Sequence, residues 1–143
     1  MPSEKTNCFV DTDVLVYAID PEEPEKRAIA ADLLRAIIRN RTLVLSAQSL
    51  NECYRVITTR RQLMPNEEAR GFIASLSPFC TAPEGFAVTR RAWDVQDATG
   101  YAWWDCLLLA SALRADCGVF MSEDLQHRRH LDDLTIMNPF VQA

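Results

Sequence analysis

The sequence predicts an α/β fold, with a central, mainly parallel sheet flanked by helices on both faces. Apolar runs of strand length alternate with helical patterns along the chain, which is typical of this class. Several of the runs are continuously apolar, as in strands that are buried on both faces. The 143 residues suffice for one core of this kind, and no repeat or linker interrupts them. We therefore expect a single domain over residues 1–143.

The first strand–helix pair occupies the N-terminal part of the chain. Residues 7–11 form a short buried strand that ends at an acid, and Asp13 is placed to cap the turn that follows. Residues 24–40 form an amphipathic helix with Pro24 in its first turn. The apolar stripe of this helix consists of Ala30, Leu33, Leu34, Ile37 and Ile38.

A second strand is predicted over residues 42–46, which are again apolar. Ser46 or Ser49 then opens a helix that runs to about Gln62, because serine is a preferred N-cap residue. Pro65 starts another helix, since proline suits a first helical turn. A brief strand is expected in the loop that follows it.

A helix is predicted over residues 84–98, and Gly100 ends it. We expect Phe86, Ala92 and Trp93 to be its core residues. The next helix, residues 103–116, is the most apolar of the chain. The last two strands are predicted over residues 117–122 and 134–138.

Composition sets limits on location and partners. No apolar run approaches the roughly 20 residues of a membrane span, and the N-terminus lacks a signal-peptide pattern, so we expect a cytoplasmic protein. The five cysteines include no C-x-x-C pair and are expected to be reduced core residues. The net charge of −5 argues against tight nonspecific binding of nucleic acid, which depends on an excess of basic side chains. After Lys26, however, every basic side chain is arginine or histidine.

Four acidic residues mark the expected ligand-binding edge of the sheet, where parallel strands end. Asp11 ends the first strand, Asp124 follows the third, Glu52 lies on the helix after the second, and Asp105 opens the most apolar helix. Each alone has an ordinary explanation as a cap, a turn residue or an exposed charge. Together they would repel one another unless a cation neutralised them. Carboxylate oxygens suit a hard divalent cation.

The sequence resembles the PIN-domain family, and within it the VapC-type toxin ribonucleases of bacterial toxin–antitoxin pairs. The segments that carry the resemblance are FVDTDVLVYAID at 9–20, LSAQSLNECYRVITTR at 45–60, YAWWDCLLLASALRADCGVFMSEDLQ at 101–126 and LTIMNPF at 134–140. The family's acidic positions map to Asp11, Glu52, Asp105 and Asp124, and Ser122 matches a recurrent hydroxyl position. Asp13 departs from the usual Asn, Ser or Thr, which leaves open whether it is a metal ligand or a cap.

The resemblance implies an endoribonuclease that depends on Mg²⁺ or Mn²⁺, forms a homodimer and is inhibited by a small VapB-like antitoxin. The four mapped acids would be its catalytic metal ligands. We expect Thr12, Ser46 and Ser122 to orient water or phosphate. Candidate RNA contacts, each with a solvated-surface alternative, are Arg90, Arg91, Arg128 and Arg129. Trp103 and Trp104 would stack on an unpaired base or, as we favour for at least one, pack in the core or a dimer contact.

A groove between helix 24–40 and the following helix is a candidate antitoxin site, with an antitoxin Arg or Lys reaching the acids. Two other functions remain open. Asp11-Thr12-Asp13 matches the first motif of haloacid-dehalogenase-type phosphatases, but that family needs a downstream lysine, and none follows Lys26. The other alternative is a catalytically silent PIN module that binds RNA or protein.

Overall fold

The computed structural model describes residues 5–141, so the outermost residues of the expected domain, 1–4 and 142–143, lie outside the described part. Its centre is a five-stranded sheet with the order β2-β1-β3-β5-β4. Four strands are parallel, and only β4 runs antiparallel, against β5. The α/β class is therefore confirmed. The strands are β1 (Asn7–Val10), β2 (Thr42–Val44), β3 (Val119–Met121), β4 (His130–Leu131) and β5 (Leu134–Met137).

Strand β1 lies at the point where the winding of the sheet reverses. Its partner on one side is β2, with Cys8 opposite Leu43, and its partner on the other is β3, with Phe9 opposite Phe120. The chain goes from β1 to β2 on one side and later returns to add β3 and β5 on the other. A crevice is expected beyond the carboxyl ends of the strands at such a switch point.

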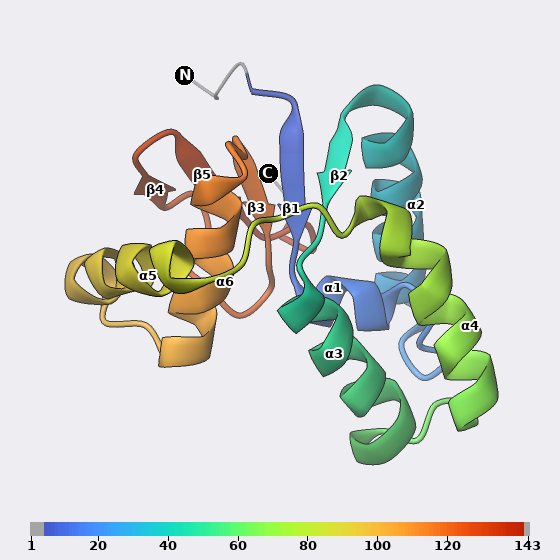
Figure 1. Cartoon of the computed structure of the whole chain (residues 1–143). Helices are drawn as coiled ribbons and strands as arrows, with labels where there is room; N and C mark the ends of the chain where they lie inside the picture. Colours follow the sequence, from blue (N-terminus) through green and yellow to red (C-terminus); the bar gives the residue numbers. More distant parts are fainter. Residues whose placement is uncertain (1–4, 142–143) are drawn as a thin grey trace.

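Helices α5 (Phe86–Thr99) and α6 (Trp103–Arg114) cover one face of the sheet (Figure 1). The strand side chains on this face alternate with those on the other, and they include Phe9 and Phe120, whose rings stack 5.1 Å apart. Both phenylalanines are fully buried beneath the apolar helix α6. This stacked pair joins β1 to β3 just below the residues that end the two strands.

The other face packs against the N-terminal helices, and Figure 1 shows α2 and α4 on the side opposite α5 and α6. Cys8, Val10 and Leu43 are the buried strand residues of this layer. The π-helical turn η1 (Val56–Arg60) continues α3, and the 3₁₀ turn η2 (Ser77–Phe79) follows α4. The helices are α1 (Thr12–Tyr17), α2 (Pro24–Asn40), α3 (Ala47–Arg55) and α4 (Asn66–Leu76).

Local sequence signals explain where several elements begin. Helix α2 has the predicted bounds, with Pro24 as its first residue. Helix α3 starts at a capping box, in which the Ser46 hydroxyl accepts from the Ser49 backbone N–H and the Ser49 hydroxyl accepts from that of Ser46. The bridge between Leu45 and Cys80 is what remains of the brief strand expected after α4.

Two predictions about the core are wrong. Phe86 and Trp93 on α5 are 61% and 46% exposed, and their rings contact each other edge to face instead of the sheet. The buried face of α5 is formed by smaller residues at helical spacing, Val88, Ala92 and Val95. Ile38, the last member of the predicted stripe on α2, is also exposed.

The described cysteines form no disulfide, and all except the half-buried Cys80 are buried. Burial raises the pKa of the Cys8, Cys53 and Cys117 thiols to about 12, so these thiols stay protonated and behave as small apolar groups. Among residues 5–141, no helix combines the length and the apolar character that crossing a bilayer requires.

Candidate active site

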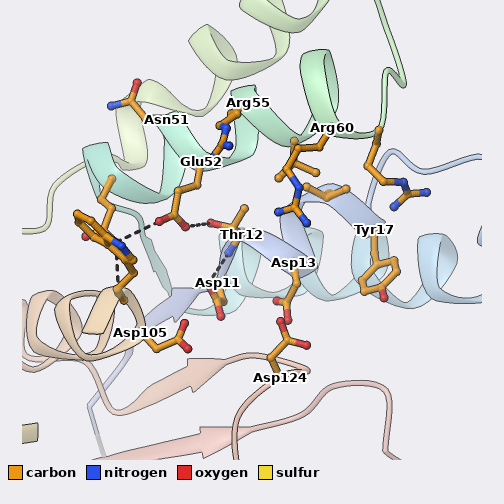
Figure 2. Close-up of a pocket in the computed structure, with 15 residues that line it drawn as sticks. Asp11, Thr12, Asp13, Tyr17, Asn51, Glu52, Arg55, Arg60, Asp105 and Asp124 are labelled. Carbon is orange, nitrogen blue, oxygen red and sulfur yellow. Dashed lines mark hydrogen bonds between the residues drawn. The ribbon is translucent and has the colours of Figure 1, made fainter. Parts of the chain in front are cut away.

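An acidic pocket of about 780 Å³ opens at the carboxyl ends of β1 and β3. Asp11 follows β1 directly, and Asp124 lies in the loop after β3. Figure 2 shows their carboxylates among others that come from α1, α3 and α6. Five acidic side chains line the pocket: Asp11, Asp13, Glu52, Asp105 and Asp124. The structure therefore brings together all four of the predicted acids and adds Asp13.

Asp11 is the most enclosed of these acids, with 6% of its surface exposed. It is the N-cap of α1, where its Oδ1 accepts a hydrogen bond of 2.7 Å from the Thr12 backbone N–H. The Ser122 hydroxyl donates to its Oδ2 at 2.9 Å. Burial, followed by the charge of Asp13, raises the pKa of Asp11 well above its usual value. Two hydrogen bonds therefore fix the Asp11 carboxylate in a buried position, where burial and the neighbouring Asp13 disfavour its ionised form.

Asp13 does not cap α1 as expected, since Asp11 holds that position. Its Oδ1 accepts from the Val14 N–H at 2.7 Å and its Oδ2 from the Glu123 N–H at 3.0 Å. Asp13 thus connects α1 to the loop after β3. Burial and the nearby charge of Asp124 raise the pKa of Asp13 to about 7. The residue that sequence left open is a fifth acid of the site.

Glu52 and Asp105 form the opposite side of the pocket. Glu52 accepts from the Thr12 hydroxyl at 3.3 Å and from the Gln48 amide at 3.2 Å. The same Gln48 amide donates to the Trp104 carbonyl at 3.2 Å, which joins α3 to the start of α6. Burial, then the charges of Asp124 and Glu52, raise the pKa of Asp105. Thr12 thus lies in the pocket and orients Glu52, and its predicted contact with water or phosphate stays a prediction.

The loop that carries Asp124 is fixed from two directions. The Ser122 hydroxyl, which donates to Asp11, also accepts from the Asp124 backbone N–H at 3.3 Å. The Glu123 side chain accepts from the Tyr17 hydroxyl at 2.7 Å and pairs with the Lys26 ammonium of α2. Ser122 is therefore a positioning residue for Asp11 and Asp124. Glu123 is not among the pocket-lining residues and holds the loop against α1 and α2.

The donor set fits a hard divalent cation in its chemistry, because it consists of carboxylate oxygens and no lysine of the described residues lines the pocket. The raised pKa values of Asp11, Asp13 and Asp105 agree with a site that favours a neutralising cation. Within residues 5–141, no three or more Asp, Glu, His or Cys side chains are arranged so that they could hold a metal ion together. Mg²⁺ commonly uses only one or two carboxylates and completes its shell with water. The residues therefore fit such an ion with water ligands, and neutralisation would let the carboxylates approach one another.

Several predicted substrate contacts lie elsewhere. Ser46 is buried in the α3 capping box and is not among the pocket-lining residues. Arg90 and Arg91 lie on α5, outside the pocket lining, where Arg91 pairs with Asp94 and Asp132 and Arg90 covers the Phe86 ring. The lining also lacks Arg128 and Arg129. The arginine pairs are conspicuous in sequence, but sequence alone does not show which surface they occupy.

The arginines that do line the pocket were missed. They are Arg55, Arg60 and Arg61, on α3, η1 and the residue that follows η1. A signal for one of them was present, because Gln48, Glu52 and Arg55 are spaced by four and three residues and so share one helical face. Placing Arg60 and Arg61 depends on the π-helical turn, which periodicity does not predict.

Arg61 has a structural partner. Its guanidinium donates to Asp20 Oδ2 at 2.7 Å, and the Asp20 carboxylate is fully buried. We expect Arg61→Gln to lower the free energy of unfolding by about 1–3 kcal/mol, because it leaves a buried charge without its cation. Urea denaturation measures this effect, and Arg60→Gln is the matched control. An equal loss in the two variants would contradict the role of the Asp20 pair.

The sequence profile of the PIN domain matches residues 8–131, which is most of the chain. The chain belongs to the PIN-domain family. This membership decides between the PIN resemblance and the phosphatase alternative in favour of the former, since the Asp11-Thr12-Asp13 match that suggested a phosphatase lies inside the PIN domain.

Solved structures with the same fold come from bacterial toxin–antitoxin systems. VapBC2 from Rickettsia felis, bound to a promoter DNA fragment, has a TM-score of 0.65 at 14% identity and covers 92% of this chain and 98% of its own. The Mycobacterium tuberculosis toxin VapC20, which cleaves the sarcin–ricin loop, has a TM-score of 0.58 at 16% identity and covers 79% of this chain and 86% of its own. VapBC-1 from nontypeable Haemophilus influenzae has a TM-score of 0.56 at 17% identity and covers 82% of this chain and 87% of its own. No curated protein sequence matches this PIN domain significantly.

Proposed function

We propose that this PIN domain is a metal-dependent endoribonuclease and the toxin of a toxin–antitoxin pair. The observation that carries the proposal is the convergence of five carboxylates in one pocket at the switch point of the sheet. Family membership and the fold shared with VapC20, a toxin that cleaves the sarcin–ricin loop, support RNA as the substrate. A net charge of −5 agrees with selective rather than nonspecific RNA binding.

Asp11, Glu52, Asp105 and Asp124 would hold Mg²⁺ or Mn²⁺, with Asp13 as an additional ligand or a charge that tunes the site. The bound ion would neutralise the scissile phosphate and lower the pKa of an attacking water. The chain itself fixes the ligands. Ser122 donates to Asp11, and Thr12 donates to Glu52. Because these hydrogen bonds exist before substrate arrives, the carboxylates need little reorganisation during the reaction.

The toxin proposal includes a VapB-like antitoxin and a homodimer. The Rickettsia felis and Haemophilus influenzae structures are VapBC proteins that share this fold. The acidic pocket is charge-complementary to an antitoxin Arg or Lys, which would compete with metal and substrate there. Co-expression with the neighbouring reading frame should yield a complex that purifies together, and recovery of the chain alone would contradict the toxin assignment.

Metal removal tests the nuclease itself. Purified, antitoxin-free protein should cleave RNA from a mixed pool, including tRNA, in Mg²⁺ or Mn²⁺, and EDTA should reduce the rate to background. Restoring excess Mg²⁺ should restore cleavage. Folded, metal-loaded protein that leaves every RNA intact would favour the catalytically silent binding module, and gel analysis of the pool distinguishes the two.

A further inference from the structure

The acidic pocket has an aromatic end and a basic end. The acids lie in a row that begins with Asp105, passes Asp11 and reaches Asp13 and Asp124 (Figure 2). Trp104 is the residue before Asp105 and also lines the pocket. Arg60 extends from η1 over Asp13, at the other end of the row (Figure 2). The two ends therefore offer different chemistry on either side of the carboxylates.

Trp104 is exposed in a way that core packing does not explain. It lies in the first turn of α6, the most apolar helix, yet 63% of its surface is exposed. The preceding residue, Trp103, packs against the core beneath α6. The Gln48 amide holds the Trp104 backbone carbonyl, so the indole is attached to a fixed point of the pocket rim. An exposed, anchored indole is a suitable surface for stacking an unpaired base.

Arg55 and Arg60 are cations with no competing partner. Among residues 5–141, neither forms an ion pair, and neither guanidinium forms a hydrogen bond. Arg61, in contrast, is occupied by Asp20 and Glu22. Glu52 lies one helical turn from Arg55, but its carboxylate binds Thr12 and Gln48 instead. Two unpaired guanidinium groups beside a carboxylate cluster would bind phosphate groups of a strand that crosses the pocket.

We propose that Trp104 and the pair Arg55 and Arg60 bind single-stranded RNA across the acidic pocket, with a base stacked on Trp104 and flanking phosphates on the arginines. The proposal rests on the nuclease function, because it names the contacts that bring RNA to the carboxylates. It also selects the substrate class. Paired bases are stacked within their own helix, so a duplex would gain nothing from Trp104.

Equilibrium binding tests these contacts apart from cleavage. The assay is the fluorescence anisotropy of a short, labelled, mixed-sequence single-stranded RNA in Mg²⁺, with Asp11→Asn as the common background to prevent cutting. Trp104→Ala should weaken binding about 5- to 30-fold, and Trp104→Phe should restore most of the loss. Trp93→Ala, which removes another exposed indole, is the matched control and should bind as the background does.

Salt dependence identifies the arginine contacts. Arg55→Gln and Arg60→Gln should each reduce the slope of log affinity against log salt by about 0.7, the value for one phosphate contact on a single strand. Trp104→Ala should leave this slope unchanged, and Arg90→Gln on α5 should change neither slope nor affinity. A duplex of the same sequence should bind more weakly and be insensitive to Trp104→Ala.

Three outcomes would overturn the proposal. The first is unchanged RNA binding in Trp104→Ala and Arg60→Gln. The second is an equal loss of RNA affinity in the control variants Trp93→Ala and Arg90→Gln. The third is a loss of antitoxin binding in Trp104→Ala or Arg60→Gln while RNA binding persists, which would assign the surface to a protein partner. Failure of the nuclease function is distinguishable from these. If the protein binds RNA through Trp104 but never cleaves it, the nuclease function fails and the proposed RNA contacts stand. If the protein cleaves RNA and the variants bind RNA normally, the nuclease function stands and the proposed contacts fail.

Discussion

Asp11→Asn is expected to reduce the rate of RNA cleavage at least about 10³-fold, because it removes a carboxylate that we propose as a metal ligand of the pocket. Asparagine has the same shape and is an equally good N-cap, so α1 should keep its start. Its side-chain oxygen can still accept from Thr12 or from Ser122. The variant should therefore be folded, and single-turnover cleavage of a defined RNA measures the loss.

Asp97→Asn is the matched control for this experiment. Asp97 is an exposed residue of α5 that does not line the pocket, so its substitution removes the same net charge without touching the site. The control should cleave within about two-fold of the unmodified chain, as a surface substitution usually does. Full activity in a folded Asp11→Asn variant would remove the central ligand from the mechanism. A melting curve that matches the unmodified chain establishes that the fold is intact.

The second large effect is on stability. Without metal, the protein should become more stable as the pH falls from 8 to 5.5. The pKa of Asp13 is about 7 in the folded state against an ordinary value of 3.8, so the folded protein gains a proton that the unfolded chain lacks. Stability should rise by up to about 1.4 kcal/mol per pH unit for one such group. The raised pKa of Asp11 acts in the same direction.

Chemical denaturation in EDTA at several pH values measures this slope, and Asp13→Asn is the variant that isolates it. The variant should be more stable than the unmodified chain at pH 8 and should lose most of that advantage by pH 5.5. Mg²⁺ should stabilise the unmodified chain at pH 8 and less so at pH 5.5, since protons compete for the same oxygens. A metal-free stability that falls steadily from pH 8 to 5.5 would contradict the repulsion among these acids.

Sequence patterns predicted the elements whose signals are local or repeated. Helix α2 has seventeen residues, a first-turn proline and a long apolar stripe, and its bounds were predicted correctly. The buried strands β1 and β3 were predicted from continuous apolar runs, and their carboxyl ends located Asp11 and Asp124. Strand β4 was missed, because its two residues are too few to show an alternation.

The site was predicted less completely, because its parts depend on tertiary placement. Four acids followed from strand ends, helix starts and the family resemblance. Asp13 was left open, since its hydrogen bond to the Glu123 backbone joins segments 110 residues apart. Phe86 and Trp93 were assigned to the core on size and hydrophobicity, whereas smaller residues face the sheet on α5. The positions of Arg60 and Arg61 depend on a π-helical turn that has no clear sequence signature.

The order of the strands also determines when the pocket exists during synthesis. Asp11, Asp13 and Glu52 leave the ribosome early, but β3 must be inserted beside β1 before Ser122 and Asp124 reach them. Until then one edge of β1 has no neighbour, and the N-terminal acids have only part of their cluster. A nascent chain that ends before α6 therefore has no complete pocket. The emergence of Asp124 from the ribosome is therefore the point from which the nascent chain is able to assemble all five acids.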